Sequence, residues 1–282
     1  MSLTTCAPSP PLIRSVHAFC PFVFRVFAGL YRLGPLTPST VLGVYPDVSC
    51  LAKILTGGLV PLSVTLASKS IYETFLSAHD RKEEALLHGH SYTAHPIGCE
   101  VARETLRTLA AMDRGPEWAD SKAKWSQYPS TDSRKGEASN QPSVWSFWSP
   151  DFVHSLSARF AQSVVAETMA LGTVLVVKLR ETASSDGTGG YSSKAAAELV
   201  ARLRTSADVD TAIMHNPSVP TSIPSASALP GANLPFRIHA RPLGNVVYVM
   251  SSLNTPEEVR SEVQRTLWEQ LLLEEEKRLS AA

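Results

Sequence analysis

Residues 46–68, PDVSCLAKILTGGLVPLSVTLAS, form a long apolar run in which Lys53 is the only basic residue. The run is divided by Thr56-Gly57-Gly58, and two consecutive glycines allow a sharp turn and a close approach of the backbone to another group. We therefore predict an apolar stretch, a turn and a second apolar stretch. Three roles are open for the amine of Lys53: it can extend to water, pair with a buried acid, or react with a carbonyl in a desolvated site.

Short apolar runs alternate with segments of helical periodicity along the rest of the chain, which places it in the α/β class. Pro96 suits the first position of a helix, Ser149 suits an N-cap, and the segment 255–258 (TPEE) is typical of a helix start. The predicted strands are 19–27, 170–179 and 245–253, and the predicted helices are 70–80, 96–112, 149–162, 192–207 and 255–279.

Two polar segments indicate the domain organisation. Residues 113–142 are rich in charged and small polar residues, which predicts a linker or an exposed insertion between two domains. Residues of about 214–235 are rich in Pro, Ser and Ala, which predicts a disordered loop. The segment GTGGYSSK at 187–194 lacks the glycine spacing of a phosphate-binding loop, so we interpret it as a loop that leads into a helix.

The composition excludes several classes of function. The chain of 282 residues has 26 basic and 26 acidic residues, so its charge gives no reason to expect a nucleic acid or an anionic membrane as partner. Its four cysteines form no CxxC pair, which favours a reducing compartment over a disulfide scaffold. His88, His90, His95 and Cys99 match no zinc spacing, so we expect no metal site.

The first acidic residue is Asp47, and Arg14, Arg25 and Arg32 precede it. An acid-free segment that contains arginine is typical of a mitochondrial transit peptide, but a short Pro-rich segment can also lack acids by chance. The two explanations stay open.

Four segments occur in a characteristic order: GLYRLG at 29–34, PDVSCLAKILTGG at 46–58, HGHSYTAHPIGC at 88–99 and IHARPLGNVVYVMSSLN at 238–254. Together they resemble the class III, pyridoxal-phosphate-dependent aminotransferases. Within that class they are most similar to the C-terminal part of the fungal adenosylmethionine-8-amino-7-oxononanoate (diaminopelargonic acid) aminotransferases, which are often fused behind a dethiobiotin synthetase domain. The resemblance extends from about Val26 to Leu272, and residues 1–25 do not share it.

The resemblance implies a role for each matching residue. Lys53 would form the Schiff base with pyridoxal phosphate and move the proton during the reaction, and the Thr-Gly-Gly turn would hold it. His90 and Ser91 would reach the cofactor phosphate of the partner subunit, and a helix that starts near Pro96 suits an anion site. Arg241 would bind the substrate carboxylate, with Gly89 also lining the substrate site.

Several of these residues also have structural interpretations. Ser91 is equally suited to capping a turn. Arg241 precedes Pro242 and Gly244, so it could instead be a surface residue at a bend.

The implied fold is the fold-type I aminotransferase fold, an α/β architecture with a mixed, mainly parallel sheet. Residues 26–112 would form the rear part of the large cofactor domain, 113–148 a polar linker, and 149–282 a small C-terminal domain. The implied reaction is transamination of 8-amino-7-oxononanoate to 7,8-diaminononanoate in biotin synthesis, with S-adenosylmethionine as amino donor. The resemblance also implies a homodimer and, for a fungal enzyme, the mitochondrion.

The sequence departs from the family in front of GLYRLG. The family has an Asp-Glu pair there, whose Asp pairs with the cofactor ring nitrogen. Phe24 and Arg25 occupy these two positions, and the half of the family that precedes them has no counterpart. Two alternatives follow: an inactive fragment that at most pairs with a full-length subunit, or a class III transaminase with another substrate, such as an ω-amino acid.

Overall fold

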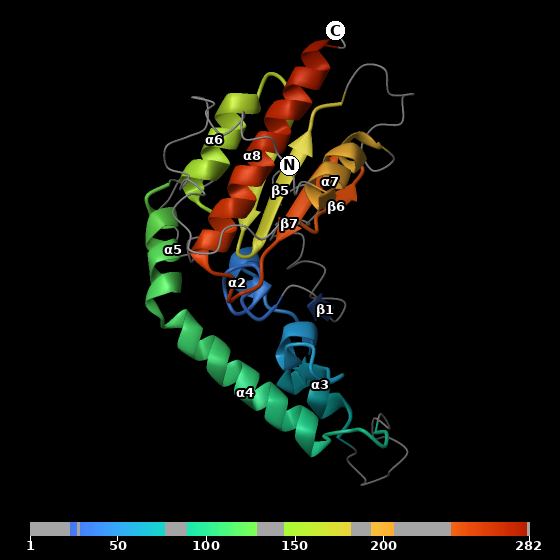
Figure 1. The fold of residues 1–282 in the computed structure, drawn as a ribbon. Helices are drawn as coiled ribbons and strands as arrows, with labels where there is room; N and C mark the ends of the chain where they lie inside the picture. Colours follow the sequence, from blue (N-terminus) through green and yellow to red (C-terminus); the bar gives the residue numbers. More distant parts are fainter. Residues whose placement is uncertain are drawn as a thin grey trace. The chain divides into compact units, whose positions relative to one another are not determined.

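A computed structural model (Figure 1) describes residues 23–26, 29–76, 89–128, 144–181, 193–205 and 238–280. The chain divides into two compact units. Unit 1 comprises residues 1–120 and 130–144, and unit 2 comprises residues 121–129 and 145–282. Most of the segment 1–25, the loop at 214–235 and most of the segment 187–194 lie outside the described residues.

Unit 1 contains a three-stranded sheet in the order β1-β2-β3, formed by β1 (Val23–Val26), β2 (Val48–Leu51) and β3 (Val64–Ala67). β1 pairs parallel with β2, and β2 pairs antiparallel with β3, so the sheet is mixed as predicted. It is not mainly parallel in the described residues, because only one of its two pairings is parallel. The remaining elements of unit 1 are α2 (Pro38–Leu42), the one-turn 3₁₀ helix η2 (Lys53–Thr56), α3 (Lys69–Thr74) and α4 (Pro96–Asp113).

The helix predicted at 96–112 is confirmed, because α4 begins at Pro96 and ends at Asp113. The segment predicted as a linker is partly helical: α5 (Pro116–Ser126) runs from unit 1 into unit 2. Pro116 suits the start of this helix, and the side chain of Trp118 is buried. The many charged residues of 113–128 therefore mark an exposed helix surface rather than an irregular linker.

Unit 2 contains an antiparallel four-stranded sheet in the order β4-β5-β7-β6. Its strands are β4 (Val165–Leu171), β5 (Val174–Leu179), β6 (Arg241–Leu243) and β7 (Val246–Met250), and its helices are α6 (Pro150–Phe160), α7 (Ala195–Thr205) and α8 (Glu257–Ser280). The prediction of one strand over 170–179 is wrong. Gly172 adopts a φ of 54°, which favours glycine, and its turn separates β4 from β5.

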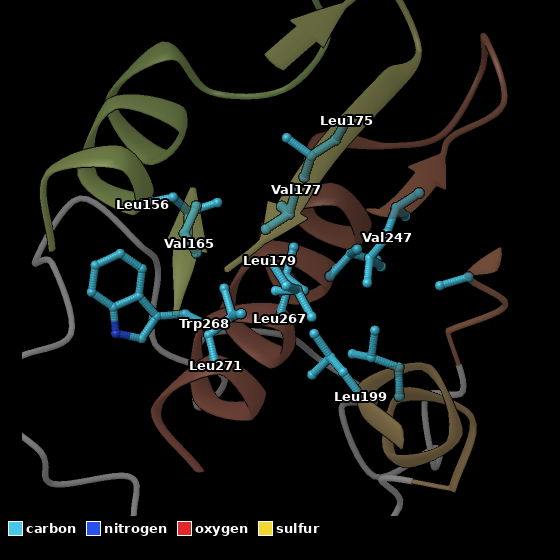
Figure 2. Packing of buried hydrophobic residues seen from close by; sticks show 14 of the residues in the cluster. Leu156, Val165, Leu175, Val177, Leu179, Leu199, Val247, Leu267, Trp268 and Leu271 are labelled. Atoms are coloured by element: carbon cyan, nitrogen blue, oxygen red, sulfur yellow. The ribbon is translucent and has the colours of Figure 1, made fainter. Parts of the chain in front are cut away.

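The core of unit 2 lies where α8 packs against the sheet. Figure 2 shows Leu267, Trp268 and Leu271 of α8 among side chains from α6, α7 and three strands. Leu267 and Leu271 have no exposed surface. Because a fully buried leucine contributes about 2 kcal/mol through burial, this cluster gives unit 2 a hydrophobic core of its own.

Within the described part of the chain, no helix combines the length and the apolar character that a membrane span requires.

Candidate functional site

Lys53 lies at the first position of η2, two residues after the end of β2. Its backbone φ is +63°, in the left-handed region that residues with a side chain rarely adopt. Such a conformation costs about 1–3 kcal/mol and persists only where the surrounding structure imposes it. The side chain is exposed, as the first of the three predicted roles requires. Desolvation of the amine would therefore have to come from a bound molecule or from further polypeptide.

The turn that follows Lys53 is held by a compact set of hydrogen bonds. The Gly57 N–H donates to the Ile54 carbonyl at 2.9 Å, and the Thr56 hydroxyl donates to the Val60 carbonyl at 2.7 Å. Thr56 is buried, so its hydroxyl bond is shielded from water. Gly57 and Gly58 have φ values of +59° and +84°, and no atom lies within 4 Å of either position where a Cβ would stand. The turn therefore needs glycine for its backbone conformation rather than for space.

The loop that contains His90 and Ser91 folds on itself directly before α4. The His90 N–H donates to the Thr93 hydroxyl at 2.8 Å, and the Tyr92 N–H donates to His90 Nδ1 at 3.1 Å. Gly89, His90 and Ser91 are all exposed. The loop thus presents an imidazole and a hydroxyl to solvent next to the N-terminus of an 18-residue helix, where an anion is favoured.

His95 caps α4, a role that the sequence interpretation missed. Its Nδ1 accepts a hydrogen bond from the Gly98 N–H at 3.3 Å. A Cβ at position 98 would lie 2.6 Å from His95 Nε2, so the imidazole requires glycine there. The sequence carries a signal for this cap, because His95 precedes the proline that opens the helix and a glycine follows two residues after Pro96. Among the described residues, no group of three or more His, Cys, Asp or Glu side chains could hold a metal ion.

Helix α4 also contacts η2, so the Lys53 turn and the helix behind the His90 loop belong to one packed arrangement in unit 1. β1 pairs with β2, the strand that ends two residues before Lys53. In the parallel register Phe24 is opposite Ser49 and Arg25 is opposite Cys50. The two positions that the family fills with acids therefore lie on the strand next to the one that leads into Lys53.

The GLYRLG segment forms a tight turn in unit 1. Leu30 and Tyr31 have φ values of +56° and +67°, and the Tyr31 hydroxyl donates to Asp113 at 3.4 Å. The Tyr31 ring meets the edge of Trp118 with 5.2 Å between the ring centroids. Burial and the charge of Asp113 raise the pKa of Tyr31, and burial lowers the pKa of Arg32. Tyr31 of this segment therefore contacts the last residue of α4 and the first turn of α5.

Arg241 lies in unit 2, at the start of the edge strand β6, opposite Tyr248 of β7. Its side chain is exposed. The hairpin between β6 and β7 turns at Gly244, whose φ is +63°, and at Asn245, whose side-chain amide donates to the Leu179 carbonyl at 3.1 Å. Arg241 thus lies on a strand whose register with β7 is set by the turn at Gly244 and Asn245. Lys53 and the His90 loop belong to unit 1, and Arg241 belongs to unit 2.

Comparison with known proteins gives a consistent family. A family model described as Aminotransferase class-III matches residues 23–132. A bifunctional dethiobiotin synthetase/adenosylmethionine-8-amino-7-oxononanoate aminotransferase of Emericella nidulans is 40% identical over 253 residues, which are 89% of this chain and 27% of that protein. A mitochondrial bifunctional dethiobiotin synthetase/7,8-diamino-pelargonic acid aminotransferase of Oryza sativa is 35% identical, covering 82% of this chain and 21% of that protein. The chain therefore spans about a quarter of the length of these relatives.

Solved structures show the same fold. The adenosylmethionine-8-amino-7-oxononanoate aminotransferase of Methanocaldococcus jannaschii matches 90% of this chain with a TM-score of 0.58 and 20% identity. An ω-transaminase of Thermomicrobium roseum matches 94% with a TM-score of 0.60 and 21% identity. This chain corresponds to 46% and 47% of those two chains. The predicted fold class is confirmed, for about half of the complete fold.

Proposed function

Because residues 23–132 belong to the class III aminotransferase family, we propose that this chain is part of a transaminase that works with pyridoxal phosphate at Lys53. The observation that carries the proposal is the conformation of Lys53, an exposed residue on a strained backbone that is followed by a buried threonine and two left-handed glycines. Backbone strain of this kind concentrates at functional sites.

The described residues fit two of the three parts of the cofactor. Lys53 is an exposed residue, and the exposed His90 and Ser91 lie before the N-terminus of α4, where a phosphate is favoured. The ring nitrogen has no acidic partner at the two family positions on β1, which hold Phe24 and Arg25. The described residues therefore fit the aldehyde end and the phosphate end of the cofactor but not its ring nitrogen.

Pyridoxal phosphate, when bound, supplies a carbonyl that condenses with amines and a ring that withdraws electron density from the substrate carbon. Lys53 Nζ would hold the proton that leaves this substrate carbon and deliver it again, since an amine on a flexible stem suits a general base. The Thr56 hydroxyl bond holds the backbone of the turn in place, so the position of Lys53 Nζ would depend mainly on the rotamer of the Lys53 side chain. His90 and Ser91 would orient the phosphate by donating hydrogen bonds to it.

We propose that the substrate is 8-amino-7-oxononanoate and the product 7,8-diaminononanoate, with S-adenosylmethionine as amino donor. The support is the relatives' names, which include adenosylmethionine-8-amino-7-oxononanoate aminotransferase, and the guanidinium of Arg241, which suits bidentate binding of a carboxylate. Gly89, exposed beside His90, would leave room for the substrate.

The assembly is part of the same proposal. Residues 26–112 would contribute to a cofactor domain, 113–148 would connect it, and 149–282 would form a small domain in a homodimer. The fusion in the Emericella nidulans relative supports a dethiobiotin synthetase domain in the complete protein, and the names of two plant relatives support a mitochondrial location.

The test is an absorbance titration of the purified chain with pyridoxal phosphate. The matched control is Lys69, an exposed lysine of the same unit whose side chain has a relative accessibility of 87%. We expect a visible band for the wild type and for Lys69→Ala, and none for Lys53→Ala. Equal bands for the two variants would contradict the proposal, because pyridoxal phosphate would then react with exposed lysines in general.

One observation favours the inactive alternative. The family acids are replaced on the strand beside the Lys53 segment, and without an acid the ring nitrogen is a weaker electron acceptor. A Phe24→Asp variant distinguishes the two functions: it should raise the transamination rate if the chain only lacks this acid. The third candidate, a class III transaminase with another substrate, is supported by relatives named as ω-aminotransferases, 36–37% identical over about 30% of this chain.

A further inference from the structure

Unit 2 contains a cavity that the proposed transamination does not use. Its volume is about 230 Å³, and its walls come from the second half of α5 with the turn after it, from residues 146–152 and from the start of α8 (Figure 1). Every lining residue belongs to unit 2. Pockets for drug-sized ligands usually have volumes of roughly 300–1,000 Å³, so this cavity suits a smaller molecule.

Aromatic side chains form part of the cavity wall. They are Trp125, Tyr128, Phe147, Trp148 and Phe152. The polar atoms of two of these rings already have partners within the protein. Trp125 Nε1 donates to the Trp148 carbonyl at 2.9 Å, and the Tyr128 hydroxyl donates to Asp151. The rings therefore offer apolar surface, which favours a ligand with a flat, apolar body.

Three polar side-chain groups in the same wall have no hydrogen-bond partner within the described part of the chain. Gln264 is 5% exposed, and its Oε1 accepts from the Ser149 N–H at 2.9 Å, which leaves the two Nε2 hydrogens without an acceptor there. The hydroxyls of Ser121, which is 9% exposed, and of the half-buried Ser261 also have no partner among the described residues. Buried polar groups without a partner are costly, so Gln264 and Ser121 indicate a ligand that accepts hydrogen bonds.

The charges around the cavity favour a single negative charge on this ligand. Lys124 pairs with Glu257 at 3.2 Å, Asp151 accepts the Tyr128 hydroxyl, and Arg260, which is 6% exposed, adds a guanidinium. The formal charges of the two acids and the two bases cancel. The N-termini of α6, with 11 residues, and of α8, with 24 residues, both line the cavity, and a helix N-terminus favours an anion. These termini fit a monoanion better than a multiply charged phosphate.

We propose that this cavity binds a small carboxylic acid as its monoanion. The carboxylate accepts hydrogen bonds from Gln264 Nε2 and from the hydroxyls of Ser121 and Ser261, and the apolar body of the ligand packs against the aromatic rings. A carboxylate fits this set of donors because each of its two oxygens accepts more than one hydrogen bond. Binding needs neither pyridoxal phosphate nor Lys53, so it is independent of the proposed transamination.

The test is isothermal titration calorimetry of the purified chain, without pyridoxal phosphate, with three probes that share one ring and one chain length. The probes are phenylacetate, its neutral amide phenylacetamide and the cation of phenethylamine. We expect saturable binding of phenylacetate at one site and at least tenfold weaker binding of the other two probes, because hydrogen bonds to a charged acceptor are the stronger ones. Equal or tighter binding of phenethylamine would overturn the proposal, since the acids of the wall would then determine the ligand.

Substitutions on α5 and α8 locate the binding site. Ser121→Leu fills the cavity from its wall and should abolish binding of phenylacetate. Ser126→Leu is the matched control, since it makes the same change on the same helix at an exposed residue outside the cavity, and it should bind like the wild type. Ser121→Ala and Ser261→Ala remove one hydroxyl each without filling the cavity, and each should weaken binding about three- to tenfold. These two variants decide the matter if thermal unfolding shows that Ser121→Leu does not fold.

Arg241→Ala separates this cavity from the other cation to which a carboxylate is assigned. Arg241 does not line the cavity, so the affinity for phenylacetate should not change in this variant. Loss of binding in Arg241→Ala would overturn the proposal and would place the carboxylate at Arg241. No saturable binding of phenylacetate, or an unchanged affinity in both Ser121→Ala and Ser261→Ala, would overturn it as well.

Discussion

Replacing Gly98 by alanine has two opposing effects on the stability of α4, and their magnitudes can be compared. Alanine in a helix is favoured over glycine by about 0.5–1 kcal/mol, so helix propensity alone predicts a more stable α4. The new Cβ, however, would lie 2.6 Å from His95 Nε2. The imidazole can avoid this overlap only by leaving the helix N-terminus, which removes its hydrogen bond from the Gly98 N–H.

Loss of an N-cap costs about 0.5–2 kcal/mol, and an imidazole that stays in place costs about 1–3 kcal/mol through overpacking. In the first turn of α4, the stabilisation that alanine gains over glycine from helix propensity is at the low end of its range. We therefore expect Gly98→Ala to destabilise the start of α4 by about 0.5–1.5 kcal/mol, equivalent to roughly two- to tenfold faster amide exchange in this turn.

Hydrogen exchange with mass spectrometry on peptides that cover residues 92–106 measures this directly. The double variant His95→Ser with Gly98→Ala is the control: serine is a good N-cap without a ring, so its exchange should be as slow as in the wild type or slower. Slower exchange in Gly98→Ala alone would refute the reasoning, because propensity would then outweigh the contact with His95.

Three further predictions concern the turn after Lys53, the hydrophobic core of unit 2 and the loss of stability at acid pH. Thr56→Val removes the hydroxyl bond to the Val60 carbonyl and should destabilise the turn by about 1–3 kcal/mol, seen as faster exchange of residues 54–60. Leu267→Ala, at a position without exposed surface, should destabilise unit 2 by about 2–5 kcal/mol in urea unfolding; a loss below about 1 kcal/mol would contradict the packing. Arg159 lowers the pKa of Glu275 by its hydrogen bond, so this pair stabilises the protein above the ordinary glutamate pKa, and the contribution disappears as the pH falls through the lowered value. Between pH 6 and about pH 3, the loss of this ion pair should lower the free energy of unfolding by about 1 kcal/mol or less. Urea unfolding of Arg159→Gln should not show that decrease.

The sequence predicts the long helices well because their ends carry explicit signals. Pro96 opens α4, and Ser149 caps α6 by accepting a bond from the Phe152 N–H. The hairpin of β4 and β5 was missed because an apolar run on both sides of Gly172 has the same appearance as one strand. The helix α5 was missed because its polar composition hides the buried Trp118.

The candidate site was predictable only in part. The Thr-Gly-Gly sequence indicates a turn after Lys53, and the structure has it, with Gly57 in the left-handed conformation. The positive φ of Lys53 itself was not predictable, because it results from the packing of the turn rather than from the preference of lysine. The capping by His95 required knowledge of where the imidazole lies relative to Gly98.

The role of Lys53 is the central claim, and peptide mapping after borohydride reduction tests it most directly. The purified chain is incubated with pyridoxal phosphate at near-equal concentration, reduced, digested and analysed by mass spectrometry. The account predicts a pyridoxyl group on the peptide with Lys53 at a several-fold higher level than on the peptide with Lys69, whose side chain is also exposed. Equal labelling of the two lysines, or labelling that leaves out Lys53, would contradict it.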